Sequence, residues 1–521
     1  MKVISAIFLS VLLMLCTWQP SGMGFNEAQA RPGGGHSSSG HSSGGSRSGS
    51  RSSGGSSWSG STSTYRSNWG NSYSSRGGTA VSMSEAEFFF ALLMVAILII
   101  VLINLRRGGG QSVYSAPTVM IKNWHSDQLA NDFAELQAID PNFSKVLLLD
   151  FVHSLYTKFY SYRGKSEFSY LTPFLAAELQ NNEPAPLVQA TIDEVVINAI
   201  HWQELKLSNP QQDSLVLVVD ANYSQHLQGK NTRYTVTERW QLVRAKGVLS
   251  QEPKKMQSLS CPHCAAPAHF NDAGVCPYCK NLLQQGAEQW YLKQRAVLQT
   301  TVLDAADLVT YAQEAGSDLM TIKAADLPER LTQFQQLHAI ENWDAFWQAW
   351  CKDIVQSYFT EIYRHWSQRD WNGVRHLLSD RLYEANQFWT DRYQQHNWFN
   401  RLDNLNIERI ILTKIELDRF YEAVTVRIFA GCYDYTEDAQ GKLIGGSKRE
   451  LRKYSEYWTF VRRTGVDNNS ADFKLGQCPH CGAPADQMGQ AGECGYCGSK
   501  ISTGEFSWVL FLIMQDDVYS G

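Results

Sequence analysis

The chain has 521 residues, enough for two or three domains with sizeable cores. It carries 46 Lys and Arg against 51 Asp and Glu, but residues 1–110 hold eight basic and three acidic side chains, which leaves 38 and 48 for the rest. This acidic excess beyond residue 110 argues against a protein that binds nucleic acid mainly by neutralising phosphates.

The N-terminus has the pattern of a secretory signal peptide. Lys2 precedes an apolar run from Val3 to Cys16, and a small-x-small site follows at Ala28-Gln29-Ala30. This order predicts a signal peptide over residues 1–30. An uncleaved membrane anchor is the alternative.

Residues 31–85 are dominated by Gly, Ser and Arg. Such a composition cannot bury enough apolar surface to offset chain entropy, so we expect a disordered, exported tail.

A hydrophobic run follows the tail. Phe88–Leu105 has eighteen residues and is broken only by Asn104. As a helix it would be about 27 Å long, close to the hydrocarbon thickness of a bilayer. The run predicts one transmembrane helix at residues 86–107, and Arg106 and Arg107 favour a cytoplasmic side for what comes next. The expected location is therefore the inner membrane, with the tail exported; a buried soluble helix is the alternative.

The remaining sequence repeats itself. Asp150–Tyr160 aligns with Asp353–Tyr363, and Glu238–Arg244 aligns with Glu456–Arg462. Two modules are therefore expected, at residues 111–300 and 341–521, with a partly helical connector at 301–340.

Each module has helical periodicity first and strand patterns afterwards, which indicates an α+β fold. The predicted elements are helices at 143–162, 168–179, 343–366 and 371–393, and strands at 190–202, 214–223, 233–244, 289–298, 407–417, 423–435, 450–462 and 505–514. Outside the metal motifs, Cys351 and Cys432 are interpreted as core residues.

Four Cys-x-x-Cys pairs form two matched sets, each placed as an insertion between the last two strands of a module. The cysteines are Cys261, Cys264, Cys276 and Cys279 in the first set, and Cys478, Cys481, Cys494 and Cys497 in the second. This spacing predicts two structural zinc ribbons, at residues 259–282 and 476–500. Iron in a rubredoxin-like site and disulfides are the alternatives. Because all four ligand positions are filled, the ribbons should stabilise the fold and not catalyse.

The order of signal, Gly/Ser-rich tail, membrane helix and the segments Lys145–Asp150 and Phe174–Glu178 resembles bacterial relatives of a mitochondrial protein family. That family is the forty-four-kilodalton, membrane-tethering subunit of the inner-membrane import translocase. The resemblance implies two tandem cone-shaped modules, similar to nuclear transport factor two, in which helices wrap a curved antiparallel sheet. It also implies membrane-proximal binding of lipid or protein without catalysis. The exported tail and the ribbons depart from the family pattern.

Two matched pairs of carboxylates are candidates for either a catalytic or a structural role. Asp150 and Asp353 occupy matching helix positions, but His153 follows only the first, so no shared dyad is expected. Glu238 and Glu456 are interpreted as surface residues paired with nearby arginines, with a buried acid as the alternative.

The expected function is a non-enzymatic membrane scaffold or binding protein, without a nucleic-acid partner. The alternatives are an enzyme with an apolar pocket and a carboxylate base, and a ribbon adaptor that contacts nucleic acid or the ribosome.

Overall fold

The computed structural model describes most of the chain beyond residue 125. The described residues are 126–163, 168–181, 190–256, 259, 261, 263–264, 266, 274–303, 319–466, 474–516, 519 and 521. The predicted signal peptide, tail and transmembrane helix lie outside these residues. No helix in the described ranges combines the length and apolar character needed to cross a bilayer.

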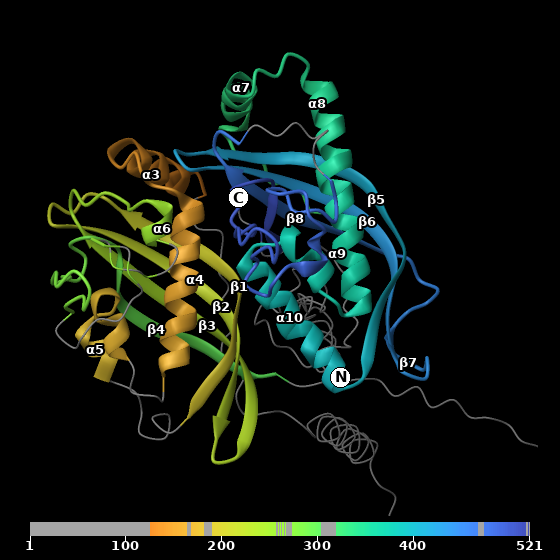
Figure 1. Cartoon of the computed structure of the whole chain (residues 1–521), viewed down its shortest axis with the longest axis horizontal. Helices are drawn as coiled ribbons and strands as arrows, with labels where there is room; N and C mark the ends of the chain where they lie inside the picture. The colour runs from red at the N-terminus through yellow and green to blue at the C-terminus, as the bar shows by residue number, and fades with distance from the viewer. Residues whose placement is uncertain are drawn as a thin grey trace, which may run out of the picture. The chain divides into compact units, whose positions relative to one another are not determined.

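The helices of the first half precede its sheet, as the pattern predicts (Figure 1). They are α3 (Ser126–Ile139), α4 (Lys145–Tyr162), the 3-10 helix η1 (Phe168–Phe174) and α5 (Ala177–Asn181). Helix α4 begins where the Ser144 hydroxyl accepts a hydrogen bond from the backbone N–H of Leu147 (3.3 Å), which is an ordinary N-cap. The single helix expected at 168–179 is wrong: with Pro173 inside, the segment forms η1 and then a separate short helix.

The first sheet is antiparallel, with strand order β1-β2-β3-β4. Its strands are β1 (Thr191–Lys206), β2 (Gln212–Leu227), β3 (Lys230–Ala245) and β4 (Tyr291–Val302), with the short helix α6 (Pro253–Met256) between the last two. The β2–β3 hairpin turns at Gln228 and Gly229, whose positive φ angles of 51° and 77° match the twist of the strands. Helix α4 packs its apolar side against this sheet (Figure 1).

The second half has the same order of helices and strands. Its helices are α7 (Leu327–Leu337), α8 (Trp343–Trp350), the π-helical segment η5 (Cys351–Gln356), α9 (Ser357–Gln368), the 3-10 helix η6 (Asn372–Leu377) and α10 (Asp380–Gln395). Its strands are β5 (Trp398–Leu417), β6 (Tyr421–Asp438), β7 (Leu443–Gly446), β8 (Arg452–Arg463) and β9 (Val509–Gln515), with the short 3-10 helix η8 (Ala485–Gln487) before the last. The sheet order is β5-β6-β8-β9, and β7 pairs with β6. Helix α7 lies within the connector at residues 301–340, for which the sequence predicts partial helix.

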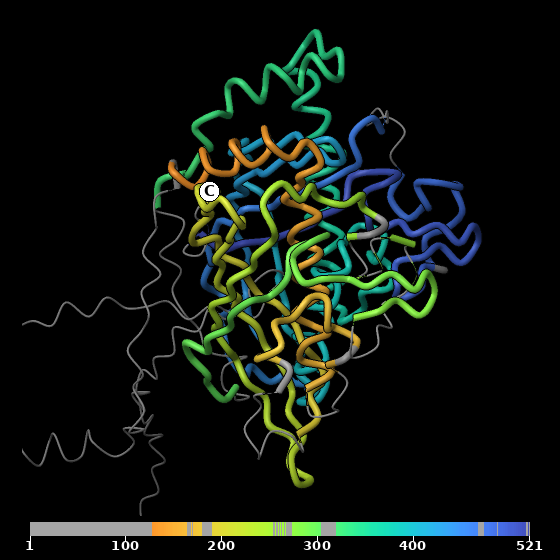
Figure 2. The backbone as a smooth tube through the Cα atoms, turned by 90° about the vertical axis from the view of Figure 1, so that its left-hand side faces the viewer, coloured from red at the N-terminus to blue at the C-terminus, as the bar shows by residue number. Residues whose placement is uncertain are grey.

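The core of the first half continues onto the second sheet. Four residues of that sheet belong to the same apolar cluster as α4, together with Phe420 in the turn between β5 and β6: Tyr421, Ala423, Val461 and Phe511. Helix α3 lies beside the second sheet (Figure 2). At the end of β5, the Gln137 side-chain amide donates to the carbonyl oxygen of Leu417 (3.3 Å). Lys145 Nζ lies 2.8 Å from Glu416 Oε1. Helix α4 therefore has apolar and polar contacts with both sheets.

His376 in η6 is a buried titratable group without a hydrogen-bond partner for either ring nitrogen among the described residues. Burial, and then the charge of His365, lowers its pKa from 6.5 to about 4. The folded protein therefore favours the neutral ring. The free energy of unfolding should fall as the pH drops from about 6.5 towards 4, by an amount of about 3 kcal/mol.

We predict that His376→Gln removes much of this acid sensitivity, because the amide does not titrate. The free energy of unfolding, measured with denaturant between pH 7 and pH 4, tests this prediction. The substitution of an exposed histidine, His396→Gln, is the matched control. Equal acid sensitivity of wild type and His376→Gln would contradict the assignment.

Candidate metal centres

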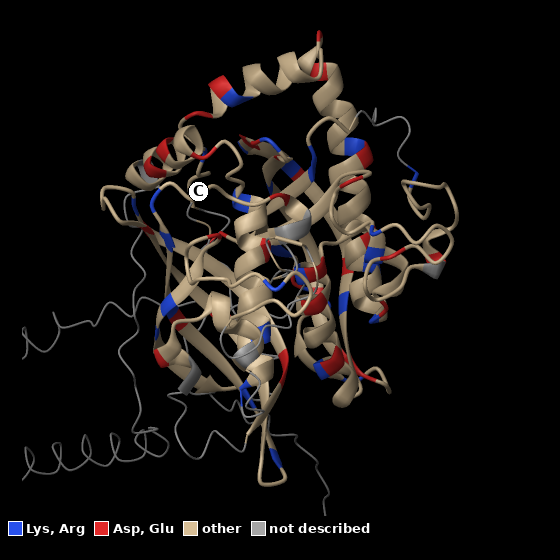
Figure 3. Ribbon diagram, turned by 60° about the vertical axis from the view of Figure 1, so that its left-hand side comes forward, with Lys and Arg blue, Asp and Glu red and all other residues tan. Residues whose placement is uncertain are grey.

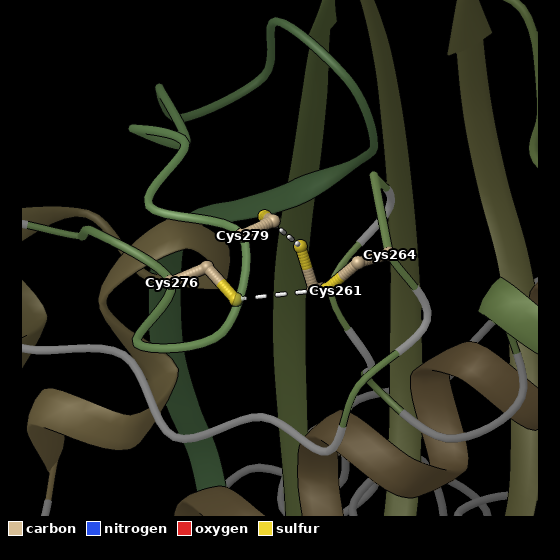
Figure 4. A group of neighbouring side chains, drawn as sticks. All are labelled: Cys261, Cys264, Cys276 and Cys279. Carbon is tan, nitrogen blue, oxygen red and sulfur yellow. Dashed lines mark hydrogen bonds between the residues drawn. The ribbon is translucent and has the colours of Figure 1, made fainter.

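The first four predicted ligands converge on one point (Figure 4). Cys261 Sγ lies 3.7 Å from Cys279 Sγ, and Cys264 Sγ lies 3.8 Å from Cys276 Sγ. All four sulfurs are within 4.8 Å of one another. Cys264 and Cys276 are 12 residues apart in the sequence, so the two knuckles together form one four-sulfur cluster.

The second four predicted ligands form the same arrangement. The Sγ distances are 3.9 Å from Cys478 to Cys497 and 3.9 Å from Cys481 to Cys494. A tetrahedral zinc ion with bonds of about 2.3 Å separates its sulfurs by about 3.8 Å, whereas a disulfide needs about 2.05 Å. The ten described cysteines are free, so both sets fit a metal ion and not the disulfide alternative.

Local backbone geometry explains how each knuckle turns. The backbone N–H of Cys478 donates to the Ala483 carbonyl (2.7 Å), and the backbone N–H of Gly482 donates to the Cys478 carbonyl (2.9 Å). The residue after the second cysteine has a positive φ in three knuckles: 62° at Lys280, 74° at Gly482 and 70° at Gly498. Glycine adopts this conformation without strain, which accounts for its place in the second ribbon.

The thiols differ in how readily they ionise. Burial raises the pKa of Cys261 and of Cys478 to about 12. The pKa of Cys497 is lowered to about 5 by hydrogen bonds from the Ser499 side chain and backbone and from His480. A metal ion binds the thiolate form of cysteine. Its positive charge would therefore favour loss of the proton from the buried thiols of Cys261 in one ribbon and Cys478 in the other. The donor set therefore fits a soft divalent cation.

Each ribbon leaves and rejoins its sheet at the same kind of base. The backbone N–H of Ala245 donates to the Gly286 carbonyl (2.7 Å), and that of Arg463 donates to the Gly504 carbonyl (2.8 Å). At both bases an arginine covers a tryptophan ring: Arg244 lies 4.7 Å from the Trp290 centroid, and Arg462 lies 4.5 Å from that of Trp508. The two bases are therefore built alike, with one glycine and one tryptophan in the same role at each.

The first ribbon packs on the helices of its own half. Cys261 and Cys276 are buried in the main apolar cluster with α4. The side-chain amide of Gln285 donates to the carbonyl oxygen of Thr172 in η1 (3.1 Å). Apolar burial therefore holds the described part of the first ribbon against α4 and η1.

The second ribbon is fixed by charge. Lys500 Nζ lies 2.7 Å from Asp380 Oδ2, and the Ser502 hydroxyl donates to Asp380 Oδ1 (2.7 Å). Arg375 pairs with the same carboxylate and also donates from Nε to the Gln490 carbonyl (2.8 Å). These cations lower the pKa of Asp380 even though burial opposes them. Sequence reasoning missed Asp380 and Arg375, because their partners in the ribbon, at Lys500, Ser502 and Gln490, lie more than a hundred residues away.

The two carboxylates assigned to the surface are fully buried, and that interpretation is wrong. Glu238 accepts from the Tyr160 hydroxyl (2.6 Å), Trp240 Nε1 (3.0 Å) and Arg295 Nε (2.8 Å). Glu456 accepts from the Tyr363 hydroxyl (2.8 Å) and Trp458 Nε1 (2.9 Å). Each glutamate therefore links the first long helix to the sheet.

The arginines expected to pair with them bind other carboxylates. Arg244 lies 2.6 Å from Asp140 and 3.2 Å from Asp213, and Arg462 lies 3.0 Å from Glu422. Glu238 and Arg244 are six residues apart in β3, so they share a face but lie about 20 Å from each other along the strand. The distance along the strand explains the error.

The other candidate acids do not converge on one another. Asp150 lies inside α4 and Asp353 inside η5, so neither caps a helix. His153 Nε2 lies 3.4 Å from Glu384, and burial followed by the charge of Arg381 lowers its pKa to about 3. His153 is therefore neutral and packs between α4 and α10.

Comparison with known proteins adds one finding. The family model described as the Tim44-like domain matches residues 344–478, about a quarter of the chain. The matched range runs from α8 to the first cysteine of the second ribbon, and it leaves out residues 145–178, which carry the resemblance in the sequence. No curated protein matches the chain.

We predict that purified protein contains about two zinc ions per chain. Cys264→Ser and Cys481→Ser should each remove about one ion, because a site with three thiolates binds zinc less tightly. Elemental analysis by plasma mass spectrometry measures this, with Cys351→Ser as the control outside both clusters. Iron in place of zinc, or the loss of both ions from one substitution, would contradict two independent zinc sites.

Proposed function

We propose that the protein is a non-enzymatic scaffold or binding protein of the inner membrane. A signal peptide (1–30) exports the tail (31–85), one helix (86–107) spans the bilayer, and the chain beyond it lies in the cytoplasm. Residues 111–300 and 341–521 act as two cone-shaped α+β modules that recognise lipid or protein. One structural zinc ion in each ribbon stabilises each module.

The Tim44-like match over residues 344–478 is the observation that carries this proposal. It favours a membrane-associated scaffold or binding role. The apolar run Phe88–Leu105 adds a means of attachment, because its length suits the hydrocarbon core of a bilayer.

The chemistry of the described residues supports binding over catalysis. Four thiolates at each centre use all the positions of a tetrahedral ion, so a substrate has no open coordination site. Glu238 is held by three donors inside the core, which suits a structural acid better than a proton-transfer group. These contacts weigh against the enzyme alternative.

The ribbons offer a surface for a partner. Tyr278 and Tyr496 occupy the same place in the second knuckle of each ribbon, and they are 60% and 59% exposed. Exposed tyrosines favour protein and membrane-interface contacts. In Figure 3, basic and acidic residues are interspersed along the ribbon, which supports these partners over nucleic acid.

In-cell photo-crosslinking tests the proposal. A benzophenone amino acid at position 278 or 496 of the full chain should give discrete adducts, while one at the exposed hairpin residue Lys230 should not. The adducts should disappear when Val95→Arg and Ile99→Arg interrupt the membrane run, because two central charges cost about 5–7 kcal/mol on insertion. Val95→Ala with Ile99→Ala is the matched control.

Retention of each chain after an alkaline carbonate wash shows whether it is embedded. A wild-type chain released by the wash would contradict the anchor. Adducts that persist in the released double-arginine chain would contradict a role at the membrane.

A further inference from the structure

A cavity of about 110 Å³ lies where α10 and the second sheet meet α4 and β1. It is on the outer face of that sheet. Ala423, Thr425 and Thr459 line it, whereas their strand neighbours Val424 and Phe460 point the other way, into the core of the second half. The cavity therefore lies on the opposite face of the second sheet from Val424 and Phe460, and no cysteine of either cluster lines it.

Apolar side chains form much of its wall, and they come from both halves of the chain. They include Val146 and Leu149 of α4, Ile200 and Trp202 of β1, and Leu382 and Trp389 of α10. Such a wall suits an alkyl group.

Arg381 of α10 brings a positive charge to this wall. Its residue is 7% exposed, its guanidinium lies 4.6 Å from the Phe511 ring centroid, and it donates one long hydrogen bond, from Nη2 to the Phe511 carbonyl (3.4 Å). None of the ion pairs among the described residues involves it. A guanidinium has five N–H donors, so a buried one with a single long hydrogen bond is suited to binding an anion.

Two amides in the same lining have unused hydrogen-bonding atoms. Asn386 is 1% exposed, and neither its Oδ1 nor its Nδ2 has a partner among the described residues. The Nδ2 of Asn198 is also buried without a partner, while its Oδ1 accepts from Asn222 (3.0 Å). Buried polar atoms are ordinarily satisfied, so two amides that face one cavity point to a polar ligand.

The charge of Asp150 in α4 partly offsets that of Arg381, although Asp150 does not line the cavity. Glu416 is the carboxylate in the lining, and it lies 2.8 Å from Lys145 and 3.2 Å from Lys414. This triad keeps a net positive charge of its own. The cavity therefore combines three cations with one carboxylate that is already paired.

We propose that this cavity binds a small organic carboxylate. The carboxylate accepts hydrogen bonds from Arg381 and from the Nδ2 of Asn386, and a short alkyl group lies against Leu149 and Trp389. A cavity of about 150 Å³ accommodates benzene, so the volume here suits a ligand of about six heavy atoms. Because the lining comes from both halves, the bound anion would stabilise their packing. The site goes beyond the scaffold role and does not depend on it.

Calorimetric titration and thermal unfolding of the full-length protein in detergent test this site. Butyrate has six heavy atoms and should bind and raise the unfolding temperature, while butyramide, its neutral analogue, should do neither. Arg381→Leu should weaken butyrate binding at least tenfold, and Asn386→Leu severalfold. Arg364→Leu is the control, since Arg364 is exposed on α9 and pairs with Glu361.

Arg381→Lys guards against a folding defect, because it keeps the charge but loses the planar fork; it should fold as wild type and bind butyrate more weakly. Equal binding of butyrate and butyramide, no binding of butyrate by the wild-type chain, or tighter binding of inorganic phosphate would overturn the proposal. Butyrate binding that Arg381→Leu leaves unchanged would overturn it as well.

Discussion

The closing of two long strand connections is the constraint on which the rest of the structure depends. In each sheet the last two strands pair although 45 residues separate them, 246–290 in one and 464–508 in the other. Closing an unstructured loop of that length costs about 3 kcal/mol. The four sulfurs of each ribbon lie within 4.8 Å of one another, so one ion bound there would fold the connection upon itself and leave a short effective loop.

The base of each ribbon connects the ribbon to the core of its own half. Arg244 and Arg462 cover the tryptophans that follow the ribbons, and each also pairs with a carboxylate across the strands. Further along β3 and β8, the buried Glu238 and Glu456 connect the same strands to the first long helix through a tyrosine hydroxyl. The metal site, the sheet and the helix therefore form one connected set of contacts in each half.

Local signals in the sequence predicted most of the elements and brought the eight cysteines into the right two groups, because knuckle geometry depends on a few neighbouring residues. The prediction failed where long-range packing decides. Glu238 is satisfied by Arg295 from β4 and not by Arg244, and only the register of the strands shows this. Asp380 forms an ion pair with Lys500, which is distant in the sequence, and the cavity at Arg381 is lined by residues of both halves. No periodicity encodes such contacts.

Hydrogen exchange of the Cys264→Ser protein tests most directly whether the metal closes the sheet. The account predicts that amides of β3 and β4 lose protection along with the first ribbon, because the long connection no longer holds the strands together. Strands β8 and β9 keep their own ribbon and serve as the internal control. Loss of protection confined to residues 259–282, with β3 and β4 as protected as in the wild type, would contradict the account.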